Sequence, residues 1–338
     1  MGENMKFTAV GDVLAQKRMP KYDGFEEIRD FIERGDVRFF NFEGSINYEG
    51  ECYASQFSGG TYVRCDPEVF SDMLGYGFNV TNFNQNHIMD FSYGGLEKTL
   101  VYAKKTGIAH SGVGKNLAEA SAPCYIDTEN GRVALISVST SFDPSMMAGE
   151  QSVRYPGRPG VNGIRHTKTI TVPRADYDRL CEIADATRIN AYSAYIRAQG
   201  YGKAPDAEIL EFGSLRFVAG ESYETKCQAD PRDLARLKQS IEEAKFQADY
   251  VIVSVHSHNV IGDDPEEPAD FYVALAHECV DCGADAVIGH GCHQLRPIEV
   301  YRERPIFYSL GDFVIQLYSL PSAPADFFAQ QGDRKSVV

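Results

Sequence analysis

The 338-residue chain lacks an excess of basic residues, because 33 Lys and Arg stand against 48 Asp and Glu, a formal net charge of -15. A nucleic-acid-binding surface normally needs a basic face, so we expect no nucleic-acid partner. The sequence also has no apolar run near the ~20 residues of a membrane-spanning helix. Since its first residues show no basic region followed by an apolar core, we see no signal peptide and expect a cytoplasmic protein.

Other familiar patterns are missing too. No second CxxC accompanies Cys279 to Cys282, which lies in a helical pattern, so we do not expect a zinc or redox site there. The eight cysteines of the chain should stay reduced in a large protein without a signal. Internal repeats and low-complexity segments are absent. With 43% hydrophobic and 24% charged residues, the composition is that of an ordinary globular protein.

What the chain does contain is an alternation of strand and helix patterns, which indicates an α/β fold. We expect strands at 5–10, 37–42, 78–82, 133–139, 250–255, 286–288 and 304–309, and helices at 25–32, 67–76, 96–105, 231–247 and 268–282. Several prolines and glycines interrupt the rhythm between 143 and 226, where a helical pattern covers 173–199. We therefore expect a single domain over 1–338 with 143–226 as an insertion or cap.

Residues of metal-binding types follow five of these strands: Asp12, Glu43, Asn86, His256, His290 and His293. Functional groups gather where the strands of α/β proteins end. Imidazole suits Zn, Fe and Mn, whereas carboxylate and amide oxygens suit Mn or Mg. Six ligands are more than one tetrahedral ion would use. The set therefore predicts one or two divalent ions, and a bridged pair would use all six residues for hydrolysis of a phosphoester or an amide.

Further residues suggest a catalytic group and a substrate site. His87 lies three positions before Asp90, and a carboxylate that orients an imidazole makes a general acid. The segment 150–170 is rich in arginine, and we expect Arg158 and Arg165 to bind a carboxylate or phosphate, although a solvated loop is the other interpretation. His258 shares a side of its strand with His256 and is expected to face the substrate.

The motifs GDVLAQ, NFEGSI, NQNHIMDFSYGGL, HSGVGKNLAEA and GADAVIGHGCHQLRPIEVYRERPIFYSLGDF together resemble those of the CapA family of capsule and poly-γ-glutamate biosynthesis. The resemblance runs from residue 6 to about 315 and is weakest across 143–226. Because that family is similar to calcineurin-like metallophosphoesterases, it implies a four-layer α/β/β/α sandwich. It also implies metal ligation by the six strand-end residues and catalysis by His87 and Asp90.

Three departures from the family pattern bear on the site. The last histidine motif contains Gly291-Cys292 where the family usually has a further histidine and a proline, and Asp312 stands where the family has asparagine. Asp12 is not followed by the histidine of the Asp-x-His pair that opens the wider superfamily. We therefore expect one of the two ions to be weakly held or missing.

Three functions fit these residues. The first is a metal-dependent hydrolase of an anionic small molecule or peptide, with either a phosphoester or a γ-glutamyl amide as its substrate. The second is a peptide epimerase that removes a Cα proton beside a polarised carbonyl. The third is a non-enzymatic component of polymer synthesis. The sequence does not choose the metal, the substrate or the oligomeric state.

Overall fold

The chain divides into two compact units. A computed structural model describes residues 5–202, 204, 206–316 and 323–330. The larger unit consists of Met1–Ile164 with Arg232–Val338, and the smaller unit is Arg165–Pro231. We placed an insertion at 143–226 from the sequence, whereas residues 143–164 cluster with the larger unit.

The first sheet of the larger unit has five strands in the order β21-β1-β2-β5-β6, and all neighbouring strands are parallel. Its strands are β1 (Phe7–Leu14), β2 (Val37–Phe42), β5 (Val80–Asn82), β6 (Ala109–Ser111) and β21 (Asp312–Ile315). Phe40 and Phe42 belong to a buried cluster with side chains of α1 (Phe25–Ile32), α2 (Pro67–Leu74) and α3 (Ser92–Thr106). These helices therefore cover one face of the sheet.

The second sheet has six strands in the order β19-β20-β18-β15-β9-β8, with parallel strands at its centre and antiparallel pairs at both edges. Its strands are β8 (Cys124–Thr128), β9 (Gly131–Ser139), β15 (Tyr250–Ser257), β18 (Ala286–Gly291), β19 (Ile298–Tyr301) and β20 (Arg304–Phe307). The central strands are nearly continuous apolar runs, as expected of strands covered on both faces. Two helices belong with this sheet, α7 (Pro231–Lys245) and α8 (Asp270–Asp281), and α8 contacts β18.

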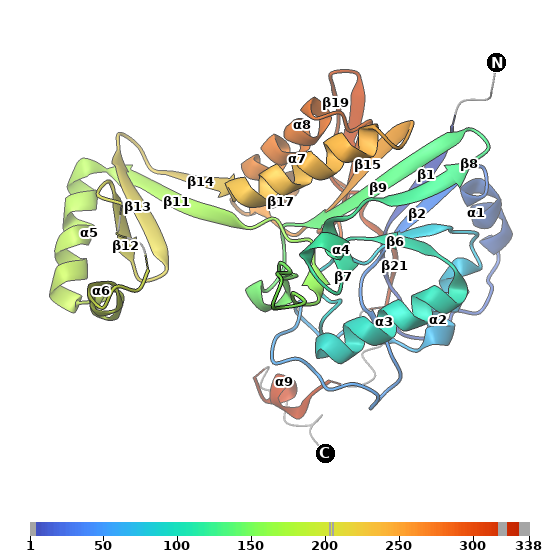
Figure 1. Cartoon of the computed structure of the whole chain (residues 1–338), viewed down its shortest axis with the longest axis horizontal. Coiled ribbons are helices and arrows are strands. Elements are labelled where there is room, and N and C mark those ends of the chain that lie inside the picture. The colour runs from blue at the N-terminus through green and yellow to red at the C-terminus, as the bar shows by residue number, and fades with distance from the viewer. Residues whose placement is uncertain (1–4, 203, 205, 317–322, 331–338) are drawn as a thin grey trace. The chain divides into compact units, whose positions relative to one another are not determined.

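The two sheets face each other across a shared apolar cluster. Because successive side chains of a strand point to opposite faces, Val37 and Phe39 lie away from the helices that contact Phe40. They pack in one cluster with Leu135 of β9 and Ile252 of β15. Figure 1 shows α7 and α8 on one side of these strands and α2 and α3 on the other. The structure is therefore a mixed α/β fold, as predicted.

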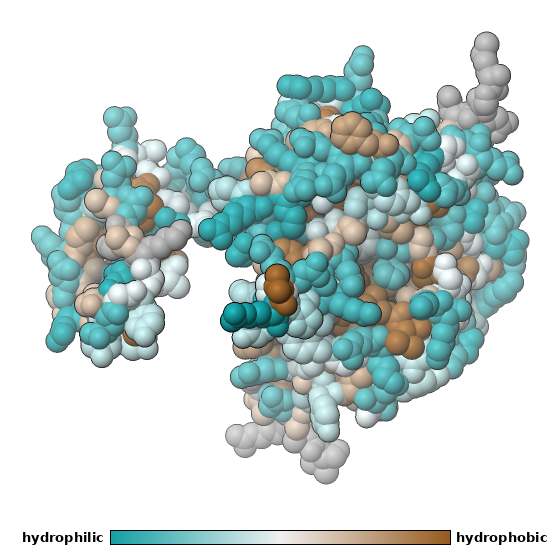
Figure 2. All heavy atoms as spheres, in the orientation of Figure 1, coloured by the Kyte–Doolittle hydropathy of each residue, from teal (hydrophilic) through white to brown (hydrophobic). Residues whose placement is uncertain are grey.

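Short elements complete the larger unit. They are β3 (Ser45–Ile46), β4 (Arg64–Cys65), β7 (Val113–Gly114), α4 (Leu117–Ser121), a 3-10 turn (Pro144–Met146), β10 (Gly160–Val161), β16 (Val260–Ile261), β17 (Asp264–Pro268) and α9 (Ala325–Gln330). Hydrophilic side chains cover most of this unit's visible face, in keeping with its acidic composition (Figure 2).

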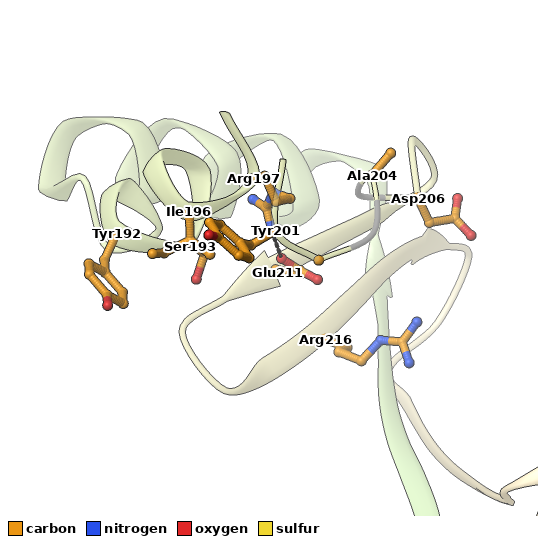
Figure 3. Close-up of a pocket in the computed structure, with 10 residues that line it drawn as sticks. Tyr192, Ser193, Ile196, Arg197, Tyr201, Ala204, Asp206, Glu211 and Arg216 are labelled. Carbon is orange, nitrogen blue, oxygen red and sulfur yellow. Dashed lines mark hydrogen bonds and ion pairs between the residues drawn. The ribbon is translucent and has the colours of Figure 1, made fainter. Parts of the chain in front are cut away.

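The smaller unit is a four-stranded sheet with two helices. The strand order is β12-β13-β11-β14, and the elements are β11 (His166–Pro173), α5 (Arg174–Thr187), α6 (Ala191–Ala198), β12 (Ile209–Phe212), β13 (Leu215–Gly220) and β14 (Glu224–Ala229). A hollow of about 540 Å³ lies beside α6, with Tyr192 and Tyr201 on its wall and Arg197 paired to Glu211 (Figure 3). Its described lining residues include no histidine or cysteine, so it offers neither imidazole nor thiolate ligands.

Three strands run further than the sequence predicted. β1 continues to Leu14, β15 to Ser257 and β18 to Gly291, because the parallel ladder persists through polar residues and pairs His256 with His290. The polar side chains that we expected in loops after these strands therefore lie within the last residues of the strands. Backbone pairing does not depend on side-chain polarity, which is why an apolar pattern ended the predicted strands too early.

Candidate metal centre

The carboxyl ends of both sheets bring the six predicted ligands into one region. In the first sheet, Asp12 lies in β1, Glu43 follows β2 directly and Asn86 follows β5; in the second, His256 lies in β15, His290 in β18 and His293 just beyond it. The sheets approach each other here, since Asp12 Oδ1 is 3.9 Å from His290 Nδ1 and Glu43 Oε1 is 3.8 Å from His256 Nε2. Groups far apart in the sequence thus share one site.

Three sets of side chains in this region have ligand atoms close enough to hold an ion. They are Asp12, His256 and His290; Glu43, His256 and His258; and Asp12, His293 and Asp312. Each set takes residues from both sheets, and Asp312 belongs to β21, the neighbour of β1 in the first sheet. The sets include His258, which we had assigned to the substrate from the sequence, and Asp312, which we had noted only as a departure from a motif.

One part of the site, which we call the Glu43 half, contains Glu43, Asn86, His256 and His258. Asn86 Oδ1 lies 2.8 Å from His256 Nε2 and 3.3 Å from His258 Nε2. Glu43 is fully buried, yet neither of its carboxylate oxygens has a hydrogen-bond partner in the structure. A buried carboxylate without a donor is costly, so the surroundings of Glu43 fit a bound cation.

The other part, which we call the Asp12 half, contains Asp12, His293 and Asp312, and its acceptors already have donors. Asn41 Nδ2 donates to Asp12 Oδ1 over 2.7 Å, and the Gly291 amide donates to Asp12 Oδ2 over 2.8 Å. The Asp312 Oδ1 to His293 Nδ1 distance is 2.8 Å. Carboxylates satisfied within the protein depend less on an added cation than Glu43 does.

The titration of the histidines follows from burial and charge. Burial lowers the pKa of His256 well below its usual value, and the neighbouring imidazoles lower it further. Burial likewise lowers the pKa of His290 to about 3. Both rings are therefore neutral near pH 7 and keep a lone pair, the form that binds metal. Burial raises the pKa of Asp12, and the negative charge of Glu43 adds to that rise.

His293 behaves differently from these two rings. Burial lowers its pKa, but the hydrogen bond with Asp312 and the charges of Glu43 and Asp12 outweigh that effect and raise the pKa to about 9. Without a metal the ring is therefore protonated at neutral pH. A metal ion would displace that proton, so binding in the Asp12 half competes with an internal ion pair.

His290 has both ring nitrogens close to protein groups. Its Nε2 lies 2.7 Å from Ser254 Oγ, and its Nδ1 lies 3.0 Å from His256 Nδ1. These contacts orient the His256 ring so that its Nε2 faces Asn86. The same Nδ1 remains within reach of Asp12, so the geometry allows His290 either to ligate or to orient its neighbour.

His87 and Asp90 form a buried pair beside the metal centre. His87 Nδ1 is 2.6 Å from Asp90 Oδ2, and the Asp90 carboxylate also accepts the backbone amides of Gly59 and Val63 over 3.0 and 2.8 Å. Burial lowers the pKa of His87, but Asp90 outweighs it, and the charge of Glu43 adds to a net rise. The pair can therefore hold a proton close to the Glu43 half.

The predicted arginines have partners within their own units. The Arg158 guanidinium donates to the Met147 carbonyl over 3.2 Å in the larger unit. Arg165 belongs to the smaller unit, where its guanidinium lies 3.8 Å from Asp230. A substrate-binding role for these two residues stays a prediction.

Several polar groups of the site were missed from the sequence. Asn41, Asn84 and Ser254 are buried near the strand ends, and Asn82 Nδ2 donates to Asn41 Oδ1 over 2.6 Å, which fixes the amide that donates to Asp12. A signal existed, since Asn41 and Ser254 are polar residues inside largely apolar strand patterns. Both lie inside the predicted strands 37–42 and 250–255, whereas we chose ligand candidates only from residues that follow a strand.

Comparison with known proteins shows the family of the chain. The family model described as bacterial capsule synthesis protein PGA_cap matches residues 2–317. The chain belongs to this family. The PGA_cap match covers all the residues of both halves of the site as well as the smaller unit. The resemblance to CapA proteins inferred from the sequence motifs is thereby confirmed.

Curated relatives extend beyond the aligned region. The uncharacterized protein y4sH of Sinorhizobium fredii is 36% identical and aligns with 92% of this chain and 66% of its own length. The capsule biosynthesis protein CapA of Bacillus anthracis is 21% identical over 92% of this chain and 60% of its own. A probable polyglutamine synthesis accessory protein of Mycobacterium tuberculosis is 27% identical over 82% and 55%. This PGA_cap chain thus spans less than two thirds of each relative.

Within the part of the chain that the structure describes, no helix combines the length and the apolar character that crossing a membrane requires.

Proposed function

We propose that this PGA_cap chain is a metal-dependent hydrolase of an anionic substrate, on a four-layer α/β/β/α sandwich of the calcineurin-like type. The observation that carries the proposal is Glu43, a buried carboxylate with no hydrogen-bond donor, 3.8 Å from the neutral imidazole of His256 and beside the His87–Asp90 pair. Two sheets that share a core and carry helices on their outer faces support the fold assignment.

The ligands would be the six predicted residues, Asp12, Glu43, Asn86, His256, His290 and His293. Mn, Zn, Fe and Mg are the candidate ions, one or two in number. When bound, a divalent ion would polarise the scissile group and activate a water molecule. His256 and His290 are neutral near pH 7, so they offer lone pairs without first releasing a proton.

His87 supplies the proton in this proposal. Asp90 holds His87 Nδ1, so the proton that leaves for the substrate is the one on Nε2. Two backbone amides fix the Asp90 carboxylate in turn, so the imidazole keeps one orientation while it donates to the leaving group. Burial of both residues keeps water from replacing the substrate as the proton acceptor.

The names of the relatives favour a γ-glutamyl amide over a phosphoester as the substrate. Relatives are named for capsule biosynthesis and for polyglutamine synthesis. A γ-linked glutamate chain carries one free carboxylate per residue, and Arg158 and Arg165 are of the type that binds carboxylates bidentately. We therefore propose cleavage of a γ-glutamyl linkage as the reaction.

A Cα epimerase would use the same pair differently, with His87 as the base that removes the Cα proton.

Both reactions can be tested with the metal-free protein after it is reloaded with Zn²⁺ or Mn²⁺. The reloaded protein is incubated in D₂O with a γ-linked glutamate oligomer, a γ-glutamyl p-nitroanilide and bis(p-nitrophenyl) phosphate. Cleavage of a γ-glutamyl probe without deuterium at Cα supports the proposal, and cleavage of the phosphodiester alone would reassign the substrate. Deuterium at Cα of intact oligomer would establish the epimerase. If no metal binds and no probe changes, the chain is a non-enzymatic component of polymer synthesis.

A further inference from the structure

The environment of His258 differs from what its position in the sequence suggested. His258 lies one residue beyond the end of β15, two positions after His256, so both imidazoles emerge on the same side of the chain. Its Nε2 lies 3.1 Å from His256 Nε2 and 3.6 Å from Glu43 Oε1. Its ligand atom therefore points into the Glu43 half of the metal centre.

Five of the six distances among the four ligand atoms of the Glu43 half are close to those of a tetrahedral site. An ion bound at 2.0–2.1 Å places its four ligand atoms about 3.3 Å from one another. Among Asn86 Oδ1, Glu43 Oε1 and the Nε2 atoms of His256 and His258, five distances are 2.8, 3.1, 3.3, 3.6 and 3.8 Å. These five values fall on both sides of the ideal edge, so the two imidazoles need little movement relative to Glu43 and to Asn86.

The backbone holds His258 in this position before any ion binds. The His258 amide donates to Ser141 Oγ over 2.8 Å. The next residue, Asn259, accepts hydrogen bonds at its side-chain oxygen from Thr140 Oγ1 over 2.8 Å and from Ser141 Oγ over 3.1 Å. A segment fixed at consecutive residues to the end of β9 costs little entropy when its imidazole binds.

We propose that His258 is a metal ligand and completes a tetrahedral zinc site with Glu43, Asn86 and His256. The assignment rests on the proposed function only in requiring that the centre binds a metal. Two imidazoles, a carboxylate and an amide oxygen suit Zn²⁺ better than Mg²⁺, which requires six oxygen ligands. Because Zn²⁺ can expand to five ligands, a water molecule or substrate oxygen could still reach the ion. His290, with its two nitrogens at Ser254 and His256, then orients His256 instead of ligating in this half.

A cysteine in place of His258 gives the most direct test. The wild-type chain and the His258→Cys variant are stripped of metal, loaded with Co²⁺ and examined by absorption spectroscopy. A thiolate bound to Co²⁺ adds a near-ultraviolet charge-transfer band, and a four-coordinate ion gives stronger visible bands than a six-coordinate one. We expect the new band only in the variant, since none of the chain's own cysteines belongs to the three candidate sets.

Metal affinity provides the second measurement. His258→Ala should weaken Zn²⁺ binding by at least about 100-fold, because losing a ligand exceeds the 10–100-fold cost of losing an outer-shell partner. His277→Ala is the matched control: its side chain is 29% exposed against 32% for His258, and it also contacts a glutamate, at 2.9 Å. We expect that control to bind Zn²⁺ as the wild type does.

The outcomes separate the two proposals. If the wild type binds Zn²⁺ but His258→Ala binds it equally well and His258→Cys gives no new band, His258 is not a ligand and the hydrolase proposal stands. If the wild type binds no metal at all, both fail. Circular dichroism of each variant in chelator shows whether it folds, and a variant that folds without binding Zn²⁺ counts for the assignment.

Discussion

The two halves of the metal centre differ in how their buried carboxylates are hydrogen-bonded. In the Glu43 half, a fully buried carboxylate has no hydrogen-bond donor and faces imidazoles. In the Asp12 half, donors from Asn41 and Gly291 satisfy Asp12, and Asp312 pairs with a histidine whose pKa is raised to about 9, after burial alone would have lowered it. The His293 imidazolium pairs with Asp312 at 2.8 Å, whereas it lies 3.7 Å from Glu43 Oε1 and makes no hydrogen bond there.

This difference indicates which half binds metal more tightly. A protonated His293 must release its proton before it can ligate, and the ion must then replace the existing pair with Asp312. No hydrogen bond has to be broken at Glu43 Oε1, which lies 3.7 Å from His293 Nε2, and the neutral His256 is ready to bind. We therefore expect a tight ion in the Glu43 half and a weaker one in the Asp12 half. The expectation of one weakly held ion, drawn from the absent Asp-x-His pair, points to the same half.

Replacing Glu43 should have the largest effect. Glu43→Gln removes the carboxylate that lies within 3.8 Å of His256, His258 and His293, and so it should abolish tight metal binding. Activity should fall on the order of 10³-fold or more, because the ion supplies several kcal/mol of transition-state stabilisation. In chelator the same variant should be more stable than the wild type by about 1–3 kcal/mol, since a neutral amide costs less to bury than a carboxylate without a hydrogen-bond donor.

Metal analysis and urea unfolding with and without chelator measure these effects. Glu97→Gln, on an exposed position of α3, is the control and should change neither. A Glu43→Gln protein that is less stable than the wild type in chelator would show that Glu43 is compensated within the protein, and the contrast between the halves would then be lost.

The next effect concerns catalysis without a change in metal content. His87→Gln should lower kcat by about 10²–10⁴-fold, the usual contribution of a positioned acid or base, and leave Zn²⁺ binding unchanged. Asp90→Asn should act through the same imidazole, so the double variant should lose little more than the His87 variant alone. Steady-state kinetics on the cleaved γ-glutamyl probe measures this. Additive losses would mean that the two residues do not work as a pair.

A backbone change can perturb the Glu43 half without touching a ligand. A Cβ at Gly291 would lie 2.8–3.0 Å from three ring atoms of His256, at a φ of +109°. Gly291→Ala should therefore displace His256 and weaken Zn²⁺ binding about 10–100-fold, as loss of an orienting group does. Gly107→Ala is the control. Gly107 has a φ of +76° and an added Cβ would have no atom within 4 Å, so this substitution introduces backbone strain without displacing a side chain.

Calorimetric Zn²⁺ titration of both glycine variants separates ring displacement from strain. Equal affinities in Gly291→Ala and Gly107→Ala would mean that the ring of His256 adjusts freely, and hence that its neighbours do not fix it.

The candidate ligands could be chosen from the sequence because their chemistry is visible in residue type. A carboxylate, amide or imidazole after an apolar strand stands out, and parallel strands place such residues at one edge. The interior of the site was not predictable in this way. Asn41 can donate to Asp12 only because their two strands are neighbours, and the sequence of either strand alone does not show this. The position of His258 likewise depends on the hydrogen bond of its amide to Ser141.

The fold could likewise be predicted from the sequence only in part. Helix and strand identities followed from periodicity, with α1 matching its predicted bounds, while the ends of β1, β15 and β18 did not. Pairing with a neighbouring strand decides where these strands end, and the sequence of a single strand does not show its pairing partner. The smaller unit's sheet was missed altogether, because prolines, glycines and a long helical pattern obscured four strands.

The smallest effect is expected in the Asp12 half. Asp312→Asn keeps an oxygen that can accept from His293 Nδ1 but removes the charge that holds the imidazolium. The tightly bound ion of the Glu43 half should stay bound. Affinity for the second ion should change by at most about 10-fold, the smallest loss of metal affinity expected when an outer-shell carboxylate is replaced. Asp72→Asn is the control, with a side chain 17% exposed against 20% for Asp312 and an arginine partner at 2.6 Å. Metal titration resolves two binding steps. A loss of the first step in Asp312→Asn would assign the tight ion to the Asp12 half and reverse the comparison.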